Sequence, residues 1–375
     1  MIDLGPALSP APGTARHVTE QAKALLSLPV PWRWRVALRE GQTLPANLPP
    51  SLETVVVPGA SAWRRASLGL NAASRGTSLV FATAYFVPLK GPPVVANFFD
   101  SNIYEHLDTW IASGRLLNGL LIRFLSNYAI RRGRRLFVNS NYCATYLRRK
   151  FPQAATKFLV TPPGILPPRT SRLTEPPAWA AGLETPFFLY VGVFSENKNQ
   201  RRLIEAYSRL QKQSPEPLSL VVIGPCDPVY AEARIQPAVR ALPNPERLIL
   251  PGRVSEEELA WAYTHAKAYV QPSIAEGFGL PILEAMSYGL PVACSNTTSL
   301  PETAGGCALL FDPLSADSIA EAMLRLVREP ALREHLRARG ETRWRAFTWE
   351  RNATQIASSI GEVLDSPVAK ASSVQ

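Results

Sequence analysis

Three features are missing from this sequence of 375 residues, and each absence excludes a class of protein. No run of about 18 apolar residues occurs, so the sequence predicts no membrane-spanning helix. The start has no basic region followed by an apolar stretch, and we therefore expect no secretory signal. The four cysteines, Cys143, Cys226, Cys294 and Cys307, show neither a Cys-x-x-Cys pair nor zinc spacing. Their spacing argues against a disulfide framework and fits a reducing cytoplasm.

Negative charge is scarce in the first half of the chain. Residues 1–185 hold 21 Lys and Arg against 9 Asp and Glu, whereas residues 186–375 hold 19 against 21. The first half therefore carries a net charge of +12 and the second half −2. A basic half indicates an anionic partner: a phosphorylated substrate, an anionic membrane surface or nucleic acid. A simple solubility bias explains it equally well.

The length and the distribution of proline predict two domains. Residues 161–186 contain seven prolines, which neither a helix interior nor a central strand tolerates. We therefore predict a linker there, between an N-terminal domain over residues 1–172 and a C-terminal domain over residues 186–349. A closing helix near 350–366 is expected to pack back on the N-terminal domain.

Short apolar runs alternate with amphipathic stretches, which is typical of a parallel sheet covered by helices on both faces. In the second half, strands are predicted over residues 187–193, 218–224 and 247–252. Helices are predicted over residues 200–211 and 281–288, and another begins at Ser255, where Glu258 completes a capping box. In the first half, strands are predicted in MIDL, VAL, TVVV, SLVFA, PVVANFF and RLFVNS, and helices near 19–27, 115–130 and 141–150. The chain is predicted to form two doubly wound α/β domains.

The stretch EGFGLPILE, from Glu276 to Glu284, has the composition of a ligand site. Gly277 and Gly279 allow the backbone to approach a ligand closely. The helix predicted to begin at Pro281 offers free N–H groups and a positive dipole end, which suit a phosphate. Because the Glu284 carboxylate would repel that phosphate, we expect Glu284 to bind sugar hydroxyls. Glu276, on the loop before the glycines, would reach the other side of the phosphate. An ordinary glycine turn with one capping glutamate is the plainer interpretation.

Lys198 is predicted to lie at the start of a helix, where the helix dipole opposes a cation by roughly 0.3–1 kcal/mol. Its placement makes sense if it serves a bound anion. A solvated lysine is the alternative. Gly192, just after a predicted strand, would leave room for the ligand.

These residues resemble a known family. The C-terminal half is similar to the retaining, nucleotide-sugar-dependent glycosyltransferases of family 4, the glycosyl transferases group 1. The similarity runs through YVGVFSENKN, through the stretch from LPGRV to PETAGG, and through FDP, and it covers about residues 186–350. Glu276 and Glu284 form the E-x7-E signature of this family. The resemblance implies the GT-B fold, in which two Rossmann-like domains face each other across a cleft.

The resemblance also implies roles for single residues. Glu284 would hold the ribose of the donor nucleotide, Glu276 would lie near the transferred sugar, and Lys198 would contact the diphosphate. Arg253 and Val254 would cradle the base. The backbone that would receive phosphate and sugar oxygens is that of Gly277, Phe278, Gly279 and Leu280.

The sequence departs from the family pattern at several positions. Val193 and Asn197 stand where many members carry an arginine. In PGTARHV, which resembles the family's glycine loop, Gly13 would lie near the diphosphate, and Ala15 replaces the second glycine. Many members end a strand of the first domain in His-Asp, whereas this chain has Phe99 and Asp100.

Asp100 is the acidic candidate at the predicted cleft. His106 could substitute for the family histidine that Phe99 replaces. The alternative is that His106 is a surface histidine or a structural one with its hydrogen bonds satisfied. The leaving diphosphate of a retaining enzyme can itself take the acceptor proton, so loss of the family histidine does not remove the enzymatic interpretation.

The resemblance therefore predicts a retaining, metal-independent hexosyltransferase. Its donor would be GDP-mannose or a UDP-sugar, and its acceptor a saccharide or lipid-linked saccharide. We expect it in the cytoplasm, with peripheral contact to the inner face of the membrane through residues 131–135 and 148–150 as one interpretation and a solvated helix face as the other. A catalytically silent protein that binds nucleotide sugars or glycans is the alternative function. No nucleic-acid-binding motif occurs, and no nucleic acid partner is expected.

Overall fold

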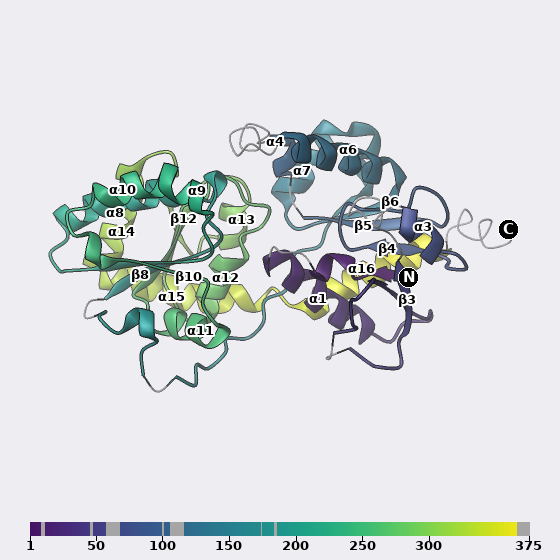
Figure 1. The fold of residues 1–375 in the computed structure, drawn as a ribbon, viewed down its shortest axis with the longest axis horizontal. Helices are drawn as coiled ribbons and strands as arrows, with labels where there is room; N and C mark the ends of the chain where they lie inside the picture. Colours follow the sequence, from purple (N-terminus) through teal and green to yellow (C-terminus); the bar gives the residue numbers. More distant parts are fainter. Residues whose placement is uncertain are drawn as a thin grey trace. The chain divides into compact units, whose positions relative to one another are not determined.

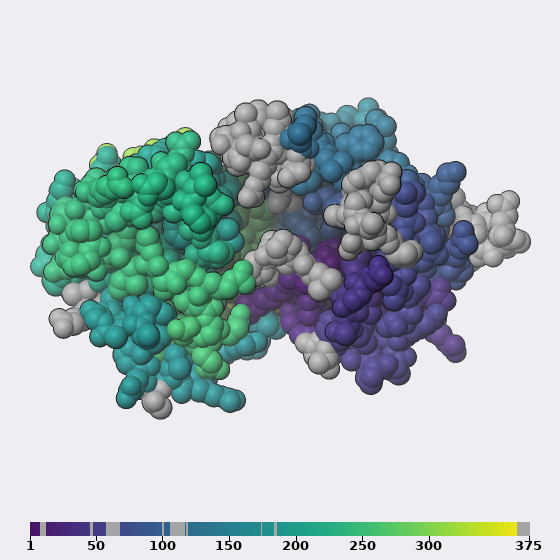
Figure 2. All heavy atoms as spheres, viewed as in Figure 1, coloured from purple at the N-terminus to yellow at the C-terminus, as the bar shows by residue number. Residues whose placement is uncertain are grey.

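A computed structural model describes residues 1–8, 12–45, 48–57, 68–99, 101–105, 116–173, 175–183 and 186–365. The chain forms two compact units, the first over Met1–Gly164 with Phe347–Gln375 and the second over Ile165–Ala346. In Figure 2 the described residues of the first unit are coloured mainly purple to blue and those of the second unit mainly teal to green. The chain thus passes from the first unit to the second after residue 164, whereas the predicted N-terminal domain extended to residue 172. The proline-rich segment belongs to the second unit because Ala180 is buried and the Trp179 ring lies 5.6 Å from that of Trp261.

The first unit is built on a seven-stranded parallel sheet in the order β3-β2-β1-β4-β5-β6-β7 (Figure 1). Its strands are β1 (Ile2–Asp3), β2 (Arg35–Arg39), β3 (Glu53–Val57), β4 (Val80–Ala82), β5 (Val94–Phe98), β6 (Gly133–Val138) and β7 (Phe158–Val160). Its helices include α1 (Pro12–Leu26), α3 (Leu70–Ala73), α4 (Asn102–Glu105), α6 (Leu116–Arg132), α7 (Asn141–Lys150) and α16 (Trp349–Asp365). Six of these strands match the predicted ones, whereas β7, only three residues long, was not predicted.

The two faces of this sheet are covered by different helices. On one face α3, α4, α6 and α7 pack against inward side chains such as Val80 and Leu136. On the other face α1 and α16 pack against Phe81 and Phe137. The closing helix predicted from the sequence is α16, and its buried Ile356 and Ile360 complete the core of the first unit. α1 begins at Pro12, well before the predicted residue 19, because proline suits the first turn of a helix.

A buried polar network joins three elements of this unit. His17 of α1 lies edge-on to the rings of Phe99 and Trp349, with centroids 4.8 and 5.0 Å away. Gln21 Nε2 donates to Asn352 Oδ1 at 3.0 Å, and Asn97 Nδ2 donates to Gln21 Oε1 at 2.6 Å. Only 4% of the surface of His17 is exposed, and burial lowers its pKa to about 3. Phe99 therefore packs in the core on a neutral imidazole.

The buried His17 predicts a pH dependence of stability. The unfolded chain binds a proton at this residue near pH 6.5, but the folded chain does so only near pH 3, so stability falls as the pH drops through this window. Between pH 7 and pH 5 we expect a loss of about 2 kcal/mol from this group, at ~1.4 kcal/mol per pH unit below its ordinary pKa. Urea denaturation of wild type and His17→Phe at both pH values measures it. Equal losses in the two proteins would contradict the assignment.

The second unit carries a six-stranded parallel sheet in the order β10-β9-β8-β11-β12-β13 (Figure 1). Its strands are β8 (Phe187–Val191), β9 (Ser219–Ile223), β10 (Leu248–Gly252), β11 (Ala268–Gln271), β12 (Val292–Ser295) and β13 (Leu309–Phe311). Its main helices are α8 (Gln200–Gln213), α10 (Gln236–Arg240), α11 (Glu256–His265), α12 (Leu280–Ser287), α13 (Leu300–Ala304), α14 (Ala316–Arg328) and α15 (Pro330–Arg345). The capping box predicted at Ser255 and Glu258 is confirmed at the start of α11.

The order of the strands locates a site. From β8 the chain moves outward through β9 to β10 and then returns to β11 on the other side of β8. The loops after β8 and β11 therefore lie beside each other at the carboxyl edge of the sheet. Ligands of open parallel sheets bind at such a reversal of strand order.

Candidate active site

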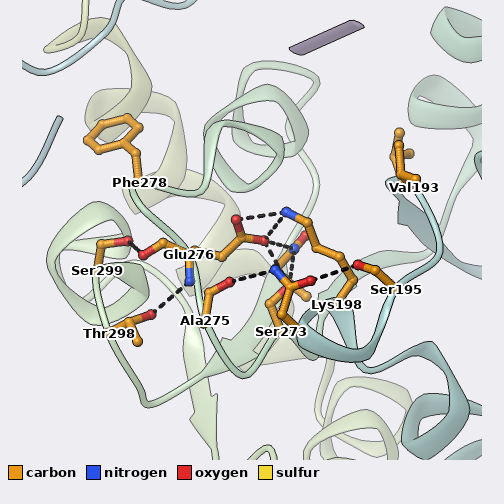
Figure 3. A network of polar contacts seen from close by, with 12 residues as sticks. Val193, Ser195, Lys198, Ser273, Ala275, Glu276, Phe278, Thr298 and Ser299 are labelled. Atoms are coloured by element: carbon orange, nitrogen blue, oxygen red, sulfur yellow. Dashed lines mark hydrogen bonds and ion pairs between the residues drawn. The ribbon is translucent and has the colours of Figure 1, made fainter. Parts of the chain in front are cut away.

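An ion pair joins the loops after β8 and β11. Lys198, from the loop after β8, places its Nζ 2.6 Å from Oε1 and 2.8 Å from Oε2 of Glu276, from the loop after β11. Figure 3 shows the two side chains pointing toward each other from their separate loops. The Glu276 side chain is 10% exposed and that of Lys198 is 26% exposed. The ammonium is thus the more accessible partner of a largely buried pair.

The carboxylate of Glu276 is held by two further donors. Gln271 Nε2 donates to Glu276 Oε1 at 3.0 Å, and Ser273 Oγ donates to the same oxygen at 2.8 Å. Gln271 is itself oriented because its Oε1 accepts a hydrogen bond from the buried Tyr269 hydroxyl. Hydrogen bonds to a carboxylate are short and directional, so they orient the group. Glu276 is therefore fixed in position by Gln271 and Ser273 on Oε1, while Lys198 contacts both of its carboxylate oxygens.

The backbone on both sides of the ion pair is also tied down. Glu276 N donates to Thr298 Oγ1 at 3.2 Å, and Ser299 Oγ donates to Glu276 O at 2.8 Å (Figure 3). On the other loop, Ile274 N donates to Asn197 O at 2.8 Å, which joins the loops after β8 and β11 directly. The site is therefore a preorganised constellation on a rigid sheet edge.

Lys198 does not lie in the first turn of an α-helix, as the sequence suggested. It ends a 3-10 turn over Glu196–Lys198, and α8 begins two residues later. Asn199 separates the two in the left-handed region, with φ of 63°. Its side-chain amide donates to the carbonyls of Pro272 and Pro313 at 2.9 and 2.8 Å, which holds this unusual turn. The local fold thus aims Lys198 at Glu276.

Two glycines of the site are required by their neighbours in the fold. A Cβ on Gly192 would lie 2.5 Å from the Tyr190 hydroxyl, so Gly192 also makes room for a buried tyrosine. Gly279 has φ of +99°, and a Cβ there would lie 2.5 Å from Leu300 Cδ2. Gly279 is the residue before α12, so Pro281 is the second residue of that helix rather than the first. Gly277, Phe278 and Leu280 flank it, and the Phe278 carbonyl accepts from Thr303 Oγ1.

Glu284 lies on α12 and contacts a tyrosine of α11. Tyr263 OH is 3.3 Å from Glu284 Oε2, and the Tyr263 ring stacks on that of Tyr288. Burial raises the pKa of Tyr269 well above its ordinary value, and the charges of Glu284 and Glu276 raise it further. Both glutamates of the signature thus lie close enough to Tyr269 to act on its charge. Glu276 lies in the loop after β11, and Glu284 lies on α12.

The remaining predicted residues lie farther from the ion pair or outside the described residues. Arg253 and Val254 follow β10, two strands from β8 along the same sheet edge, and Arg253 is exposed. Gly13 is exposed in the first turn of α1, in the first unit, so PGTARHV is helical rather than a loop. Asp100 and His106 lie outside the described residues.

Sequence reasoning missed the residues that position Glu276, namely Gln271, Ser273, Thr298 and Ser299. Gln271 and Ser273 did leave a signal. Both are polar residues at the carboxyl end of a strand whose other residues are apolar, immediately before the EGFG stretch. Thr298 and Ser299 come from the loop after β12, and only the strand pairing brings them to Glu276.

Two searches of the described residues bear on metals and membranes. Within the ranges given above, no three His, Cys, Asp or Glu side chains come together as a set of metal ligands. In the same ranges, no helix is both long and apolar enough to cross a membrane.

Solved structures share the architecture of the whole chain. Sucrose-phosphate synthase from Thermosynechococcus elongatus matches with a TM-score of 0.74 at 21% identity, over 97% of this chain and 98% of that chain. Alr3699/HepE from Anabaena, in complex with UDP-glucose, matches with a TM-score of 0.68 at 17% identity, over 96% and 99%. The fold is that of the GT-B glycosyltransferases.

The second unit matches a known family model. Residues 171–343 match the family model described as glycosyl transferases group 1. Over 169 residues the chain is 37% identical to the O-antigen chain mannosyltransferase B of Escherichia coli, a match that covers 45% of this chain. The match covers 44% of that relative, so it spans less than half of its length. The second unit is therefore similar to the glycosyl transferases group 1, and the ion pair of Lys198 and Glu276 lies within the matched residues.

Proposed function

We propose that the protein is a retaining glycosyltransferase that moves a hexose from a nucleotide diphosphate sugar to a saccharide or lipid-linked saccharide. The observation that carries this proposal is the preorganised pair of Lys198 and Glu276 at the strand-order reversal of the sheet. An accessible ammonium beside an oriented carboxylate suits a substrate whose diphosphate and sugar lie side by side. The match to a mannosyltransferase makes mannose the first sugar to test, with GDP-mannose as donor and UDP-sugars next.

The proposed reaction uses the cation where charge develops. The acceptor hydroxyl oxygen forms a bond to the anomeric carbon on the face that the diphosphate leaves, and the bond from that carbon to the diphosphate oxygen breaks. The acceptor proton passes to the departing diphosphate. Lys198 Nζ and the N–H groups at the start of α12 neutralise the diphosphate, so no metal is needed for this step. Glu276 lies beside the transferred sugar.

Other residues complete the donor site in this proposal. Glu284 holds the ribose hydroxyls, and Arg253 and Val254 contact the base. Gly192, Gly13 and the backbone from Gly277 to Leu280 surround the diphosphate. Asp100 is the acidic residue proposed at the acceptor side, with His106 as its alternative.

Calorimetric titration with GDP, UDP and ADP tests this proposal. Wild type should bind one nucleotide, and Glu284→Ala should bind it about 10–100-fold more weakly, since hydrogen bonds to a charged group contribute about 1.5–3 kcal/mol. Glu321→Ala, an exposed glutamate of α14, is the matched control and should bind normally. A folded wild type that binds no nucleotide would contradict the transferase proposal.

A catalytically silent protein is the second candidate, because Val193 and Phe99 replace residues common in similar enzymes. Val193 is 44% exposed and offers no charge. Such a protein would bind the nucleotide and never turn over its sugar. Incubation of wild type with the bound donor and a panel of acceptors distinguishes the two.

A further inference from the structure

Two tyrosines of the second unit connect Glu284 to the segment with which the chain enters that unit. The Tyr263 hydroxyl of α11 donates to Glu284 Oε2 of α12 at 3.3 Å. The Tyr263 ring stacks on that of Tyr288, which follows α12, with centroids 5.0 Å apart and an interplanar angle of 14°. The Tyr288 hydroxyl in turn accepts a hydrogen bond from the backbone N–H of Arg169 at 3.0 Å. We name Tyr263 and Tyr288 the tyrosine pair.

Tyr263 is held firmly enough to orient a partner. Only 2% of its surface is exposed, and its ring also lies 6.1 Å from that of the fully buried Tyr269. Glu284 is only half-buried and has a flexible side chain. Such a side chain loses conformational entropy when it binds a ligand, unless a fixed partner has already restricted it. The Tyr263 hydroxyl supplies this restriction.

The segment behind the tyrosine pair is itself fixed in place. The Arg169 N–H is the first that the chain offers after two consecutive prolines, which stiffen the backbone before it. Beyond it, Ser171 Oγ donates to the Glu257 carbonyl at 3.2 Å. Arg172 N donates to Glu257 Oε2 at 2.9 Å. The segment is therefore tied both to the start of α11 and to Tyr288.

We propose that the tyrosine pair positions Glu284 for the ribose of the donor nucleotide, and that the Arg169 N–H holds the pair in place. This inference rests on the proposed function, in which Glu284 binds the ribose hydroxyls. Tyr263 and Tyr288 are positioning residues, because they act through the carboxylate. A carboxylate that is already oriented accepts from the ribose hydroxyls at a smaller entropic cost, so the affinity for ligands that carry ribose rises.

Calorimetric titration of Tyr263→Phe tests the proposal with whichever of GDP, UDP and ADP wild type binds. We expect the affinity to fall roughly three- to tenfold, the usual effect of one hydrogen bond. The 2′,3′-dideoxy form of the same nucleotide should bind wild type and Tyr263→Phe equally, because it lacks the hydroxyls that Glu284 would accept from. Tyr207→Phe is the matched control, since its buried hydroxyl donates to the carbonyls of Leu218 and Arg247 at 2.7 and 3.2 Å. It loses comparable hydrogen bonds but should bind both ligands as wild type does.

Arg169→Pro tests the contact behind the tyrosine pair. Proline has no N–H, so Tyr288 loses its donor. Arg169→Ala is the control, because it removes the side chain and its ion pair with Glu256 but keeps the N–H. We expect Arg169→Pro to weaken nucleotide binding roughly two- to threefold and Arg169→Ala to leave it unchanged. Combined with Tyr263→Phe, Arg169→Pro should cause no further loss, because both substitutions act through the same hydrogen bond to Glu284.

Wild-type affinity in Tyr263→Phe, beside a loss in Glu284→Ala, would overturn this proposal and leave the proposed function standing. An equal loss for the ribose and dideoxy forms would also overturn it, because the tyrosine pair would then serve the fold alone. Wild-type affinity in Arg169→Pro would overturn the part assigned to the segment. A wild type that binds no nucleotide, or binds it without need of Glu284, would remove the proposed ribose site and this inference with it. Circular dichroism of each variant shows that it folds.

Discussion

Replacing Lys198 with methionine is expected to lower the rate of sugar transfer by ~10²–10³-fold, the effect of removing one donor aimed at developing negative charge. Methionine keeps an unbranched side chain of similar length but carries no charge. The departing diphosphate then loses its nearest cation, and the carboxylate of Glu276 loses the partner that lies 2.6 and 2.8 Å away. Nucleotide affinity should fall as well. Initial rates and calorimetric titration measure the two effects.

Lys212→Met is the matched control, because Lys212 is an exposed lysine at the end of α8. It should retain full activity. Since the methionine variant leaves a largely buried carboxylate without its cation, its thermal unfolding must be recorded beside its activity. A folded Lys198→Met protein with the wild-type rate would remove Lys198 from the proposed mechanism.

Glu276→Gln is expected to separate rate from binding. Glutamine has the shape of glutamate, but it cannot accept from Lys198, Gln271 and Ser273 in the same way and it carries no charge. We expect transfer to fall by ~10²-fold or more because the transferred sugar loses its oriented carboxylate. Diphosphate affinity should rise, since Lys198 no longer has a carboxylate to leave when the nucleotide binds. The same titration and rate assay as for Lys198 measure both quantities.

Nucleotide affinity is expected to fall in Lys198→Met and to rise in Glu276→Gln, and these opposite signs distinguish loss of the ion pair from loss of structure. A general loss of structure in the loop after β11 would weaken nucleotide binding in both variants. Glu321→Gln in α14 is a suitable control for the substitution itself, because Glu321 is an exposed glutamate away from the loops after β8 and β11. Wild-type turnover by Glu276→Gln would show that the carboxylate serves the fold and not the reaction.

The Glu276 carboxylate and the diphosphate of the proposed donor compete for the Lys198 ammonium. In the structure, both Glu276 carboxylate oxygens contact the Lys198 ammonium. A diphosphate offers more negative charge than one carboxylate, and the side chain of Lys198 is the more exposed of the two. We therefore expect the ammonium to turn toward the diphosphate while Gln271 and Ser273 keep Glu276 in place. This division of contacts explains why Glu276 needs hydrogen bonds of its own.

Elements with strong local signals were predictable. The strands of both sheets follow from short apolar runs, and the capping box at Ser255 follows from two residues three apart. The start of α1 was missed because the sequence after Pro12 resembles a glycine loop, and proline at a helix start outweighs one glycine. Strands β7 and β13 were not predicted, and each is three residues long and lies at the edge of its sheet.

In the candidate site, the chemical groups could be predicted from the sequence, but the contacts between them could not. Glu276, Lys198 and Glu284 could be singled out because a carboxylate, a cation and two glycines beside a helix start have a chemical meaning in the sequence alone. The contact between Lys198 and Glu276, which are 78 residues apart, could not be predicted. Nor could the hydrogen bonds from Gln271, Ser273 and Ser299, because each depends on which strands are neighbours and in what register.

The chain of residues thus specifies the class of fold, the two halves of different charge and the identity of the chemical groups. Those properties depend on composition and on contacts within a few residues, so they can be read without coordinates. The ion pair and the orientation of its carboxylate depend on long-range packing. They bring together residues of the loops after β8, β11 and β12, and no local signal shows which loops become neighbours until the strands have paired.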